Sequence, residues 1–447
     1  MRSAPIGLPH VGAALRRSGV HNLRLGRRGF AAGTYPIAPR GGLTLSVPLP
    51  AFCAGRKRAA GGRAQKEPAK ENIIMSVAGI IAEYNPFHAG HALHIRETRN
   101  LLGDCAVVAV MSGNFVQRGE CALLDKWTRA RAALEGGADL VLELPTVWAA
   151  ASAEGFARGA VGVLAATGVV THLSFGSECG NVEELQRVAA CLDSAAYRAG
   201  LRRFLDEGLS FAACRQGAVG ELLGEGPAGL LACPNNNLGI EYIRALSGLG
   251  SKIRSVTVRR AGAGHDGGDH PEYPSASFLR ERILAGELPA DNPASLKYGE
   301  RAALARLRAM DQGDFAALPD CGEGLDRRLF RAVRQGRSLE EAYALAKTKR
   351  YAHARIRRAL LWGALGLRED HRPGEVPYLR VLGASGRGRE VLREMKGRAA
   401  VPLVTKPAHG RGMPLLELEA RCTDFYQLCR REPGGCGLEW TANPVMV

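Results

Sequence analysis

Two hydrophobic patterns follow one another along this chain of 447 residues. Between residues 75 and 290, short apolar runs alternate with segments whose apolar residues recur every three to four positions. Short apolar runs predict buried strands and the longer spacing predicts helices, so their alternation is typical of a parallel sheet with crossover helices. The sequence predicts strands at 77–82, 105–111, 139–144 and 170–175, and a helix at 126–136.

The pattern changes after residue 290. From Ser295 to about Leu367 the chain is dominated by helix formers, and a strand-like run begins only at Tyr378. The predicted fold class is therefore α/β, with a Rossmann-like parallel-sheet domain over residues 75–290. A mainly helical, basic C-terminal domain is expected over residues 291–447.

The first 74 residues show neither pattern. They are rich in Arg, Gly, Pro and Ala and hold 13 Lys and Arg against 2 Asp and Glu. An Arg-rich leader can be an organelle transit peptide, a basic arm for nucleic acid, or a stretch that is not translated. We favour the third interpretation, with translation starting at Met75 directly before the first strand, and expect residues 1–74 to be disordered in each case.

Charge divides the chain in the same way. The formal net charge is +16, but residues 75–290 carry −4 and residues 291–447 carry +9. A uniformly basic protein is thus excluded, and the positive tail suits a polyanionic partner. No run approaches the ~20 apolar residues of a membrane-spanning helix. The 11 cysteines are scattered without a CxxC pair, which disfavours a zinc ribbon and favours a reduced, cytoplasmic protein.

A candidate site for chemistry follows the first predicted strand. His88-Ala-Gly-His91 stands where the next helix should begin. Two imidazoles three residues apart share one face of a first helical turn, and Gly90 lets a phosphate approach the backbone. The helix N-terminus adds free N–H groups and a positive dipole, which suit the charge that develops on an α-phosphate during adenylyl transfer. The chain has no P-loop motif.

The segment Ile80–His91 resembles the opening motif of the bacterial tRNA(Met) cytidine acetate ligase family, within the HIGH-type nucleotidyltransferase superfamily. Further motifs of that family follow in the same order: Val110–Glu120, Lys126–Arg129, Gly137–Pro145, Phe175–Glu178, Pro234–Gly239 and Arg260–Asp266. The resemblance extends from about residue 76 to the C-terminus. Because it excludes the leader, it supports Met75 as the start.

The resemblance implies a two-step reaction. ATP and acetate would give acetyl-adenylate and pyrophosphate, and the acetyl group would then pass to the exocyclic amine of the wobble cytidine of elongator tRNA(Met), forming N4-acetylcytidine. His88 and His91 would be catalytic. Carried over by motif, the ATP-binding residues would be Ile81, Ala82, Glu83, Tyr84, Asn85, Pro86, Phe87, His88, Ala89, Gly90, His91, Ala92, Leu93, His94, Gly176, Asn235, Arg260 and Ala261.

Some of these residues also have simpler interpretations. Asn235 follows a proline and suits a turn or helix cap, and Arg260 suits a solvated face. Mg²⁺ would arrive with ATP, and no protein-bound metal is expected, although His265-Asp266 superficially resembles a metal pair.

The segment Ser275-Ala-Ser277, which ends three residues before Arg280, resembles the second signature of the superfamily. In this interpretation Ser275, Ser277 and Arg280 would contact the β- and γ-phosphates from a helix N-terminus. An ordinary N-cap is the alternative.

Basic residues on two predicted helices are candidate tRNA contacts. Lys126 and Arg129 lie three residues apart on the first of these helices. In the tail, the segment 347–358 holds the densest charge, with apolar positions that would face a core. Lys347, Arg350, Arg357 and Arg358 would then follow a phosphate backbone. A solvated amphipathic helix is the alternative interpretation.

Two other functions compete with the ligase. A nucleotidyltransferase that adenylates a small phosphorylated cofactor precursor would explain His88 and His91 but leaves the basic tail without a role. An RNA-binding protein with a degenerate nucleotide site would explain the tail but not the intact histidines. The sequence assigns no residue to an acetate pocket or to anticodon recognition, and it does not give the oligomeric state.

Overall fold

The computed structural model describes residues 76–260 and 274–447, which belong to one compact unit. The predicted leader at 1–74, the candidate ATP residue Ala261 and the pair His265-Asp266 lie outside these residues. None of the helices in the described part of the chain is long and apolar enough to cross a membrane.

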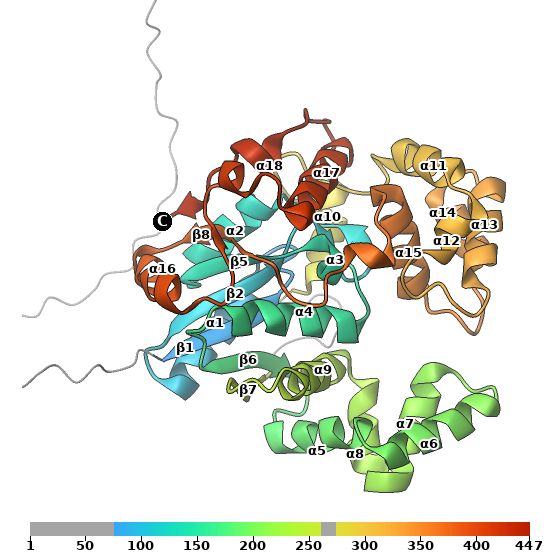
Figure 1. The fold of residues 1–447 in the computed structure, drawn as a ribbon, viewed down its shortest axis with the longest axis horizontal. Coiled ribbons are helices and arrows are strands. Elements are labelled where there is room, and N and C mark those ends of the chain that lie inside the picture. Colours follow the sequence, from blue (N-terminus) through green and yellow to red (C-terminus); the bar gives the residue numbers. More distant parts are fainter. Residues whose placement is uncertain (1–75, 261–273) are drawn as a thin grey trace, which may run out of the picture. The chain divides into compact units, whose positions relative to one another are not determined.

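A mixed sheet forms the centre of the fold, with the spatial strand order β10-β8-β5-β2-β1-β6-β7 (Figure 1). Its strands are β1 (Val77–Ala82), β2 (Ala106–Ser112), β5 (Leu140–Leu144), β6 (His172–Ser177), β7 (Arg254–Arg259), β8 (Leu379–Ala384) and β10 (Val445–Met446), and β9 (Leu403–Val404) pairs with β8. The strands β5, β2, β1, β6 and β7 are parallel, whereas β8 is antiparallel to β5. The four predicted strands are therefore confirmed as β1, β2, β5 and β6, with ends displaced by at most two residues.

Both faces of the sheet are covered, which explains why its strands are apolar runs rather than alternating patterns. Ala78 and Ile80 of β1 belong to one core cluster, and Val77 and Ile81 belong to the other. On the first face lie α1 (Ala89–Leu102) and α2 (Lys126–Glu135), and on the second lie α3 (Thr146–Ala149), α4 (Ala153–Ala166), α9 (Pro234–Gly248) and α16 (Gly386–Arg398). The fold class is thus the α/β, Rossmann-like arrangement that the sequence predicts.

A group of helices is inserted between β6 and α9. It contains α5 (Val182–Leu192), α6 (Ala195–Asp206), α7 (Phe211–Leu223), α8 (Glu225–Gly229) and the short 3-10 helix η1 (Leu230–Ala232). Helix α5 packs on α9, and Figure 1 shows the whole group at the β6–β7 side of the sheet.

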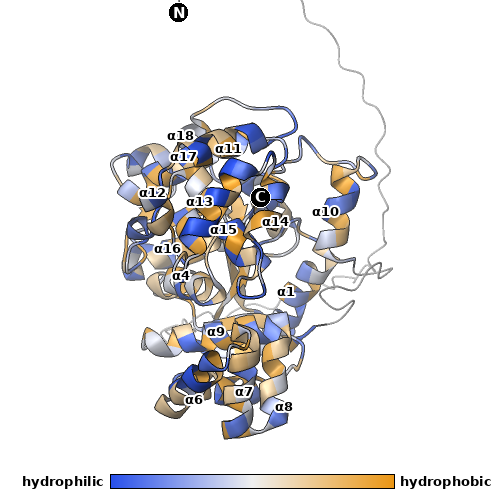
Figure 2. Cartoon of the chain, turned by 90° about the vertical axis from the view of Figure 1, so that its right-hand side faces the viewer, coloured by the Kyte–Doolittle hydropathy of each residue, from blue (hydrophilic) through white to orange (hydrophobic). Residues whose placement is uncertain are grey.

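The predicted helical segment of the tail is confirmed. It follows α10 (Ala276–Leu284) and consists of α11 (Glu300–Ala309), α12 (Gln312–Ala316), α13 (Leu325–Gln335), α14 (Leu339–Ala346) and α15 (His353–Leu365). Helices α13 and α15 alternate hydrophilic and hydrophobic residues along their length (Figure 2), as amphipathic helices do. Helix α15 packs against the two-stranded hairpin of β3 (Phe115–Val116) and β4 (Glu120–Cys121). Gly119 permits this approach, because a Cβ there would lie 2.5 Å from the backbone nitrogen of Arg358.

The end of the chain corrects the predicted domain boundary. Residues 291–447 do not form a helical domain apart from the sheet, because β8, β9 and β10 return to it. The remaining elements of this return are η2 (Glu369–His371), η3 (Pro407–Gly410), α17 (Pro414–Leu428) and α18 (Leu438–Thr441). All six residues of β8 are buried. A local apolar pattern predicts a strand at this position but not its partner, and here β8 pairs with a strand more than 200 residues earlier.

Candidate active site

The candidate site lies where the strand order reverses. From β1 the sheet continues through β2 and β5 on one side and through β6 and β7 on the other. Parallel α/β sheets bind ligands at the carboxyl ends of strands at such a switch point. The loop after β1 ends at His88, His91 lies in the first turn of α1, and β6 carries Gly176 close to its end. Most of the predicted ATP-binding residues are therefore brought to one edge of the sheet.

His88 and His91 organise the first turn of α1 around themselves. His88 is the N-cap, and its Nδ1 accepts a hydrogen bond from the backbone N–H of Gly90 at 3.1 Å. In return, Nδ1 of His91 accepts from the backbone N–H of His88 at 3.2 Å. This reciprocal pair is a capping box made of two imidazoles. Because both Nδ1 atoms act as acceptors, the hydrogen of each neutral ring is on Nε2 and is available as a donor.

Aromatic side chains hold these rings in place. The ring centroids of His88 and His91 are 3.8 Å apart, with an angle of 31° between the planes. Tyr84 and Phe87 pack on His91 with centroid distances of 4.8 and 5.5 Å. Tyr84 has a φ of 46° and is the second residue after β1, so the chain turns sharply there and brings its ring against His91. This packing restricts the rotamers of His88 and His91, which suits a site that must be formed before the substrate binds.

His88, His91 and His94 at the start of α1 are neutral at pH 7. Burial and the positive charge of Arg260 lower the pKa of His88 to about 4. Burial, followed by the neighbouring histidines and Arg260, lowers the pKa of His91 well below its usual value. His94, whose Nε2 lies 3.1 Å from the Oγ of Ser174, has its pKa lowered to about 4 by burial and Arg260. A bound polyanion would reverse part of this effect, because negative charge favours the imidazolium form.

The loop after β1 is fixed by the β3–β4 hairpin and by α10. The Glu83 carboxylate accepts from the N–H of Gln117 at 2.9 Å, and Oδ1 of Asn85 accepts from the N–H of Leu123 at 2.7 Å. The carbonyl of Asn85, which precedes a cis peptide bond to Pro86, accepts from Nη1 of Arg280 at 2.9 Å. Glu83 and Asn85 thus position the loop with their side chains.

On the other side of the site, Glu178 organises the N-terminus of α9. Its carboxylate accepts from the backbone N–H groups of Asn235 and Asn236 at 3.1 and 2.7 Å, and from Nδ2 of Asn235 at 2.7 Å. Oδ1 of Asn235 faces Nη1 of Arg260 at 3.4 Å. Asn235 therefore connects the N-terminus of α9 to the side chain of Arg260. The alternative interpretation of Asn235 as only a turn or cap residue does not account for these side-chain contacts.

Gly176 explains why Arg260 can lie across the end of β6. A Cβ at this position would be 3.2 Å from the Cγ of Arg260. The sequence places Glu178 at the end of the motif Phe175–Glu178 but does not predict that its carboxylate binds the N-terminus of α9. Two features of the sequence could have indicated this role: a carboxylate stands just past a strand end, and a helix begins with Pro-Asn-Asn. A carboxylate is stabilised by the free N–H groups at such a helix N-terminus.

The residues of the second predicted phosphate motif, Ser275, Ser277 and Arg280, make different contacts in the structure. Ser275 is the N-cap of α10 and accepts from the N–H of Phe278 at 3.2 Å, which is the simpler of its two interpretations. Oγ of Ser277 accepts from Nη2 of Arg280 at 3.0 Å. Arg280 joins α10 to the loop after β1, so the motif lies beside the histidines. A phosphate contact by Ser275, Ser277 or Arg280 stays a prediction.

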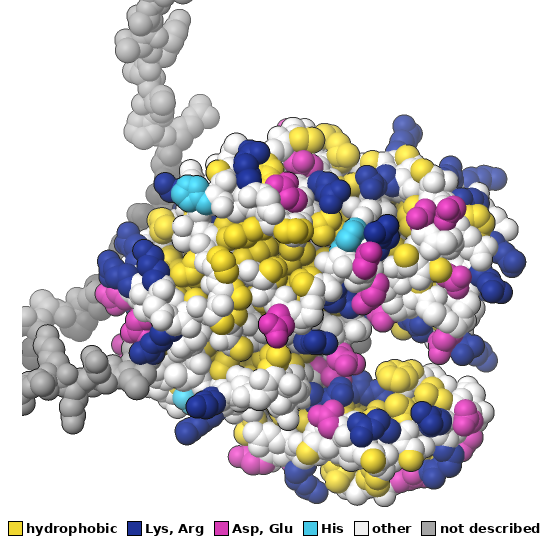
Figure 3. Space-filling model, viewed as in Figure 1, with side chains coloured by type: hydrophobic (Ala, Val, Ile, Leu, Met, Phe, Trp, Pro, Cys, Tyr) yellow, Lys and Arg dark blue, Asp and Glu magenta, His cyan; other side chains and the backbone are white. Residues whose placement is uncertain are grey.

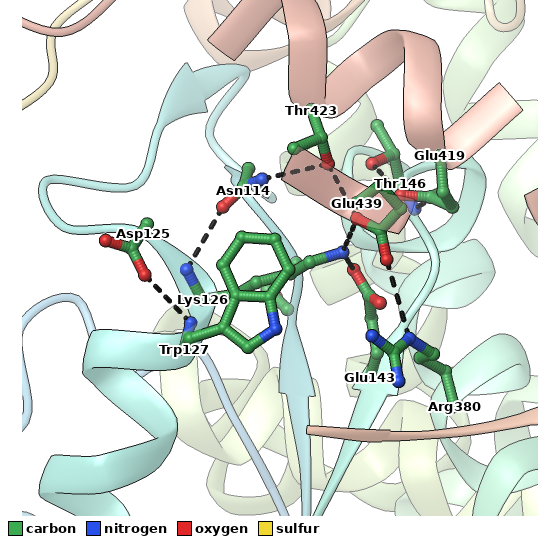
Figure 4. Close-up of polar contacts among 12 residues, drawn as sticks. Asn114, Asp125, Lys126, Trp127, Glu143, Thr146, Arg380, Glu419, Thr423 and Glu439 are labelled. Atoms are coloured by element: carbon green, nitrogen blue, oxygen red, sulfur yellow. Dashed lines mark hydrogen bonds and ion pairs between the residues drawn. The ribbon is translucent and has the colours of Figure 1, made fainter. Parts of the chain in front are cut away.

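Lys126 and Arg129 are not tRNA contacts, and this prediction was wrong. Lys126 is 0% exposed, and its Nζ lies 2.6 Å from Glu143 and 2.5 Å from Glu439 (Figure 4). Arg129 is 1% exposed and donates to the carbonyl oxygens of Glu83, Ser112, Gly113 and Leu124. The C-terminal segment covers this surface, which the spacing of charges along α2 alone does not reveal.

The four candidate tRNA residues of the tail are in different environments. Lys347 donates from Nζ to the carbonyls of Thr348 and Tyr351, and Arg357 pairs with Glu120 and Glu340. Arg358 is partly buried against the hairpin and donates to the carbonyl of Gln117. Arg350 is exposed, with Glu323 at 3.6 Å. The expectation that all four project into solvent is therefore wrong for Arg357 and Arg358.

Basic side chains are nevertheless frequent on this part of the surface. On the face shown in Figure 3, Lys and Arg side chains gather over the region of α11–α15 and again over α16. Residues 76–260 and 274–447 contain no group of three or more His, Cys, Asp or Glu side chains arranged to hold a metal ion.

Comparisons with known proteins identify the family of this chain. The profile of a family described as HIGH Nucleotidyl Transferase matches residues 75–435. A tRNA(Met) cytidine acetate ligase of Clostridium botulinum (strain Langeland) is 36% identical over 388 residues, covering 79% of this chain and 94% of that protein. One from Thermoanaerobacter sp. (strain X514) is 34% identical over 396 residues, covering 82% of this chain and 98% of that protein.

Solved structures give the same result. The apo crystal structure of Thermotoga maritima TmcAL superposes with a TM-score of 0.78 at 33% identity, covering 83% of this chain and all of that one. The structure of the same protein bound with alpha-thio ATP superposes with a TM-score of 0.76 at 34% identity and with the same coverage. The resemblance found in the motifs is thus confirmed, and this chain belongs to the tRNA(Met) cytidine acetate ligase family of HIGH-type nucleotidyl transferases.

Proposed function

We propose that this protein is an ATP-dependent acetate ligase that acetylates the wobble cytidine of elongator tRNA(Met). The observation that carries the proposal is the pair His88 and His91 at the N-terminus of α1, at the switch point of the sheet. Curated relatives bear this activity in their names, and a solved relative binds an ATP analogue. The predicted loop Ile81–His94, with Gly176, Asn235 and Arg260, is the proposed ATP site.

In the first step an oxygen of acetate attacks the α-phosphorus of ATP, and pyrophosphate leaves. Negative charge accumulates on the α-phosphate oxygens in the transition state. The Nε2–H groups of His88 and His91 are free to donate to these oxygens because both Nδ1 atoms are occupied by the capping box. Preformed donors of this kind stabilise developing charge without reorganisation. Arg260, with its side chain beside Asn235, supplies a positive charge at the same edge of the sheet.

In the second step the exocyclic amine of cytidine attacks the acetyl carbon, AMP leaves, and the amine loses one proton. The polyanionic tRNA would approach helices α11–α15 from the side of Arg350, the one of the four candidate tail residues that is exposed; it lies in the segment between α14 and α15. Mg²⁺ is proposed only as the ion that accompanies ATP, and no step is assigned to it. A cytoplasmic location fits the tRNA substrate and the free thiols of the cysteines in the described residues.

The test uses the purified full-length chain. We expect acetate-dependent exchange of pyrophosphate into ATP in the absence of tRNA. With ATP and radioactive acetate, elongator tRNA(Met) should become labelled, and the same tRNA with uridine at the wobble position should not. A protein that makes no label in tRNA would contradict the proposal. ATP consumption with a phosphorylated cofactor precursor in place of acetate would instead support the alternative nucleotidyltransferase.

A further inference from the structure

A cavity of about 190 Å³ has Arg280 of α10 in its wall and is not part of the candidate ATP site. It opens between the β3–β4 hairpin, α10 and the helices α11, α14 and α15, so both the sheet part and the helical part of the chain line it. Its wall includes Glu120, Arg280, Leu284, Glu340, Tyr343 and Arg357. The volume is below the ~300–1,000 Å³ of sites for drug-sized ligands and matches a single planar ring better than a whole nucleotide.

The cavity shares a wall with the loop that carries the histidines. Arg280 lines the cavity and also donates to the carbonyl of Asn85, three residues before His88. The hairpin that supplies Glu120 is bonded to the same loop, through Glu83 to Gln117 and through Asn85 to Leu123. A ring held in the cavity would therefore lie beside the position proposed for the acetyl-adenylate.

The charges in the wall do not suit a polyphosphate. Three carboxylates, those of Glu120, Glu300 and Glu340, stand against three cations, those of Arg280, Lys297 and Arg357. Arg357 pairs with both Glu120 and Glu340 and lies over the ring of Tyr343, so these side chains are held in a fixed arrangement. Such a balanced wall offers no net attraction to a triphosphate, but it offers both donors and acceptors to a neutral polar ring.

Cytosine has the matching edge. Its exocyclic amine donates, whereas N3 and O2 accept, and Glu or Asp side chains are suited to accept from that amine. Apolar wall residues such as Leu284, Leu123 and Ala294 would contact the ring itself. Proteins that modify a base in an RNA loop splay the base out of its stack into a pocket of this kind.

We propose that this cavity receives the acceptor cytosine of the tRNA, with Glu120 accepting from the exocyclic amine and Arg280 donating to the ring. The inference rests on the proposed function and assigns it a second subsite, distinct from the ATP loop. Glu120 is then the residue that distinguishes cytosine from uracil, because uracil carries a carbonyl oxygen where cytosine carries the amine. A carboxylate facing that oxygen would repel it.

Two variants test the cavity. Leu284→Trp fills it from a side chain that is 36% exposed in the structure, so folding should be retained. Glu120→Gln keeps the shape and leaves an amide oxygen for Arg357. Leu205→Trp is the matched control, since Leu205 lies on α6 with 43% exposure and outside the cavity. Three rates or affinities are measured for each protein: acetate-dependent pyrophosphate exchange, tRNA(Met) binding on filters, and acetyl transfer to tRNA in a single turnover.

Leu284→Trp and Glu120→Gln should lower acetyl transfer by roughly 10- to 100-fold, the range expected for losing one good hydrogen-bonded base edge. In Leu284→Trp, pyrophosphate exchange and tRNA binding should stay within about threefold of wild type. In the control Leu205→Trp, exchange, tRNA binding and acetyl transfer should all stay within about threefold of wild type. Unchanged transfer in Leu284→Trp, or an equal loss of exchange and transfer in that variant, would overturn the assignment. A wild-type protein without acetate-dependent exchange would instead overturn the proposed function itself.

Discussion

The loop around His88 follows β1, whereas the cluster around Lys126 lies at β5 and β8, and the two regions hold their buried polar groups in opposite ways. In the cluster, charged side chains from distant segments pair with one another: Lys126 with Glu143 and Glu439, and Arg380 with Glu439 at 3.4 Å (Figure 4). In the loop, the imidazoles are neutral and are held by backbone groups and aromatic rings.

This difference indicates that the cluster around Lys126 stabilises the fold, whereas the histidines at the start of α1 are suited to bind a ligand. A buried cation that already touches two carboxylates has little capacity left for a ligand, and removing one partner leaves the others uncompensated. A neutral imidazole at a helix N-terminus, with its Nε2–H free, gains a favourable interaction when an anion arrives. Burial alone does not distinguish the two sites, whereas the partners of each polar atom do.

The largest expected effect comes from breaking the cluster. Lys126→Met leaves Glu143 buried without a cation and Glu439 paired with Arg380 alone, and we expect a loss of about 3–5 kcal/mol in the free energy of unfolding. Urea denaturation followed by circular dichroism measures it. Lys252→Met, at an exposed lysine, is the control and should change stability by less than about 0.5 kcal/mol. A cost below about 1 kcal/mol for Lys126→Met would show that the cluster is not a stabilising unit.

Removing an imidazole from the loop should affect chemistry more than stability. His88→Ala or His91→Ala removes one proposed donor to the α-phosphate, worth about 2.7–4 kcal/mol of barrier, so acetate-dependent exchange should fall by roughly 10²- to 10³-fold. The affinity for tRNA should stay near that of wild type.

The exposed His409 on η3 provides the matched control for these two variants. His409→Ala should retain full exchange activity. Equal losses of exchange and of tRNA affinity in His88→Ala or His91→Ala would contradict a division between an ATP loop and a separate tRNA surface.

His94 of the first region and Glu419, which lies beside the cluster, should respond oppositely to pH. His94 has a folded pKa of about 4 against an ordinary value of 6.5, so below pH 6.5 the unfolded chain binds a proton that the folded chain does not. Stability should therefore fall as the pH drops from 6.5 to 4, by up to about 1.4 kcal/mol per pH unit for this group. His94→Gln should reduce this slope in urea titrations at several pH values, with His88 and His91 accounting for the remainder, and an unchanged slope would contradict the assignment.

Glu419 on α17 should make stability change with pH in the opposite direction. Burial and the neighbouring Glu143 raise its pKa to about 8, so the folded chain holds a proton that the unfolded chain has released above pH 4.5. Its contribution to stability is fully present below pH 4.5 and is lost as the pH rises through 8. Glu419→Gln should remove this dependence and leave the loss between pH 6.5 and 4 intact. Both variants are read from the same set of unfolding curves.

The smallest effect is expected at α10. Ser275→Ala removes an N-cap and should cost about 0.5–2 kcal/mol in unfolding free energy. If Ser275 is only a cap, the KM for ATP should not change. A several-fold rise in that KM, absent in the exposed-site control Ser247→Ala, would support the phosphate contact that the motif suggests.

Elements with strong local signals were predictable. The strands at 77–82 and 139–144 are apolar runs bounded by polar, Gly-rich loops, and they appear within one residue of the predicted bounds as β1 and β5. The position of His88 before a helix followed from the strand that precedes it. The reciprocal bonds between His88 and His91 did not follow, because a helix start does not specify the rotamers of its side chains.

Long-range contacts account for what the sequence missed. Lys126 and Arg129 look like an exposed basic pair on a helix, since the chain that covers them is β8, α17 and α18, more than 250 residues later. The same return of the chain moves the predicted boundary at residue 290. The hairpin that receives Arg357 and Arg358 is likewise separated from them by more than 200 residues.

The sequence by itself determined the α/β class, the placement of His88 and His91 between a strand and a helix, and the family through an ordered set of motifs. These depend on periodicity and on residue order, both of which are local. Only the tertiary structure decided which charges pair inside the protein and which can meet a ligand. The free energy of a buried charge depends on the groups around it in space, and those groups come from segments that the sequence does not place side by side.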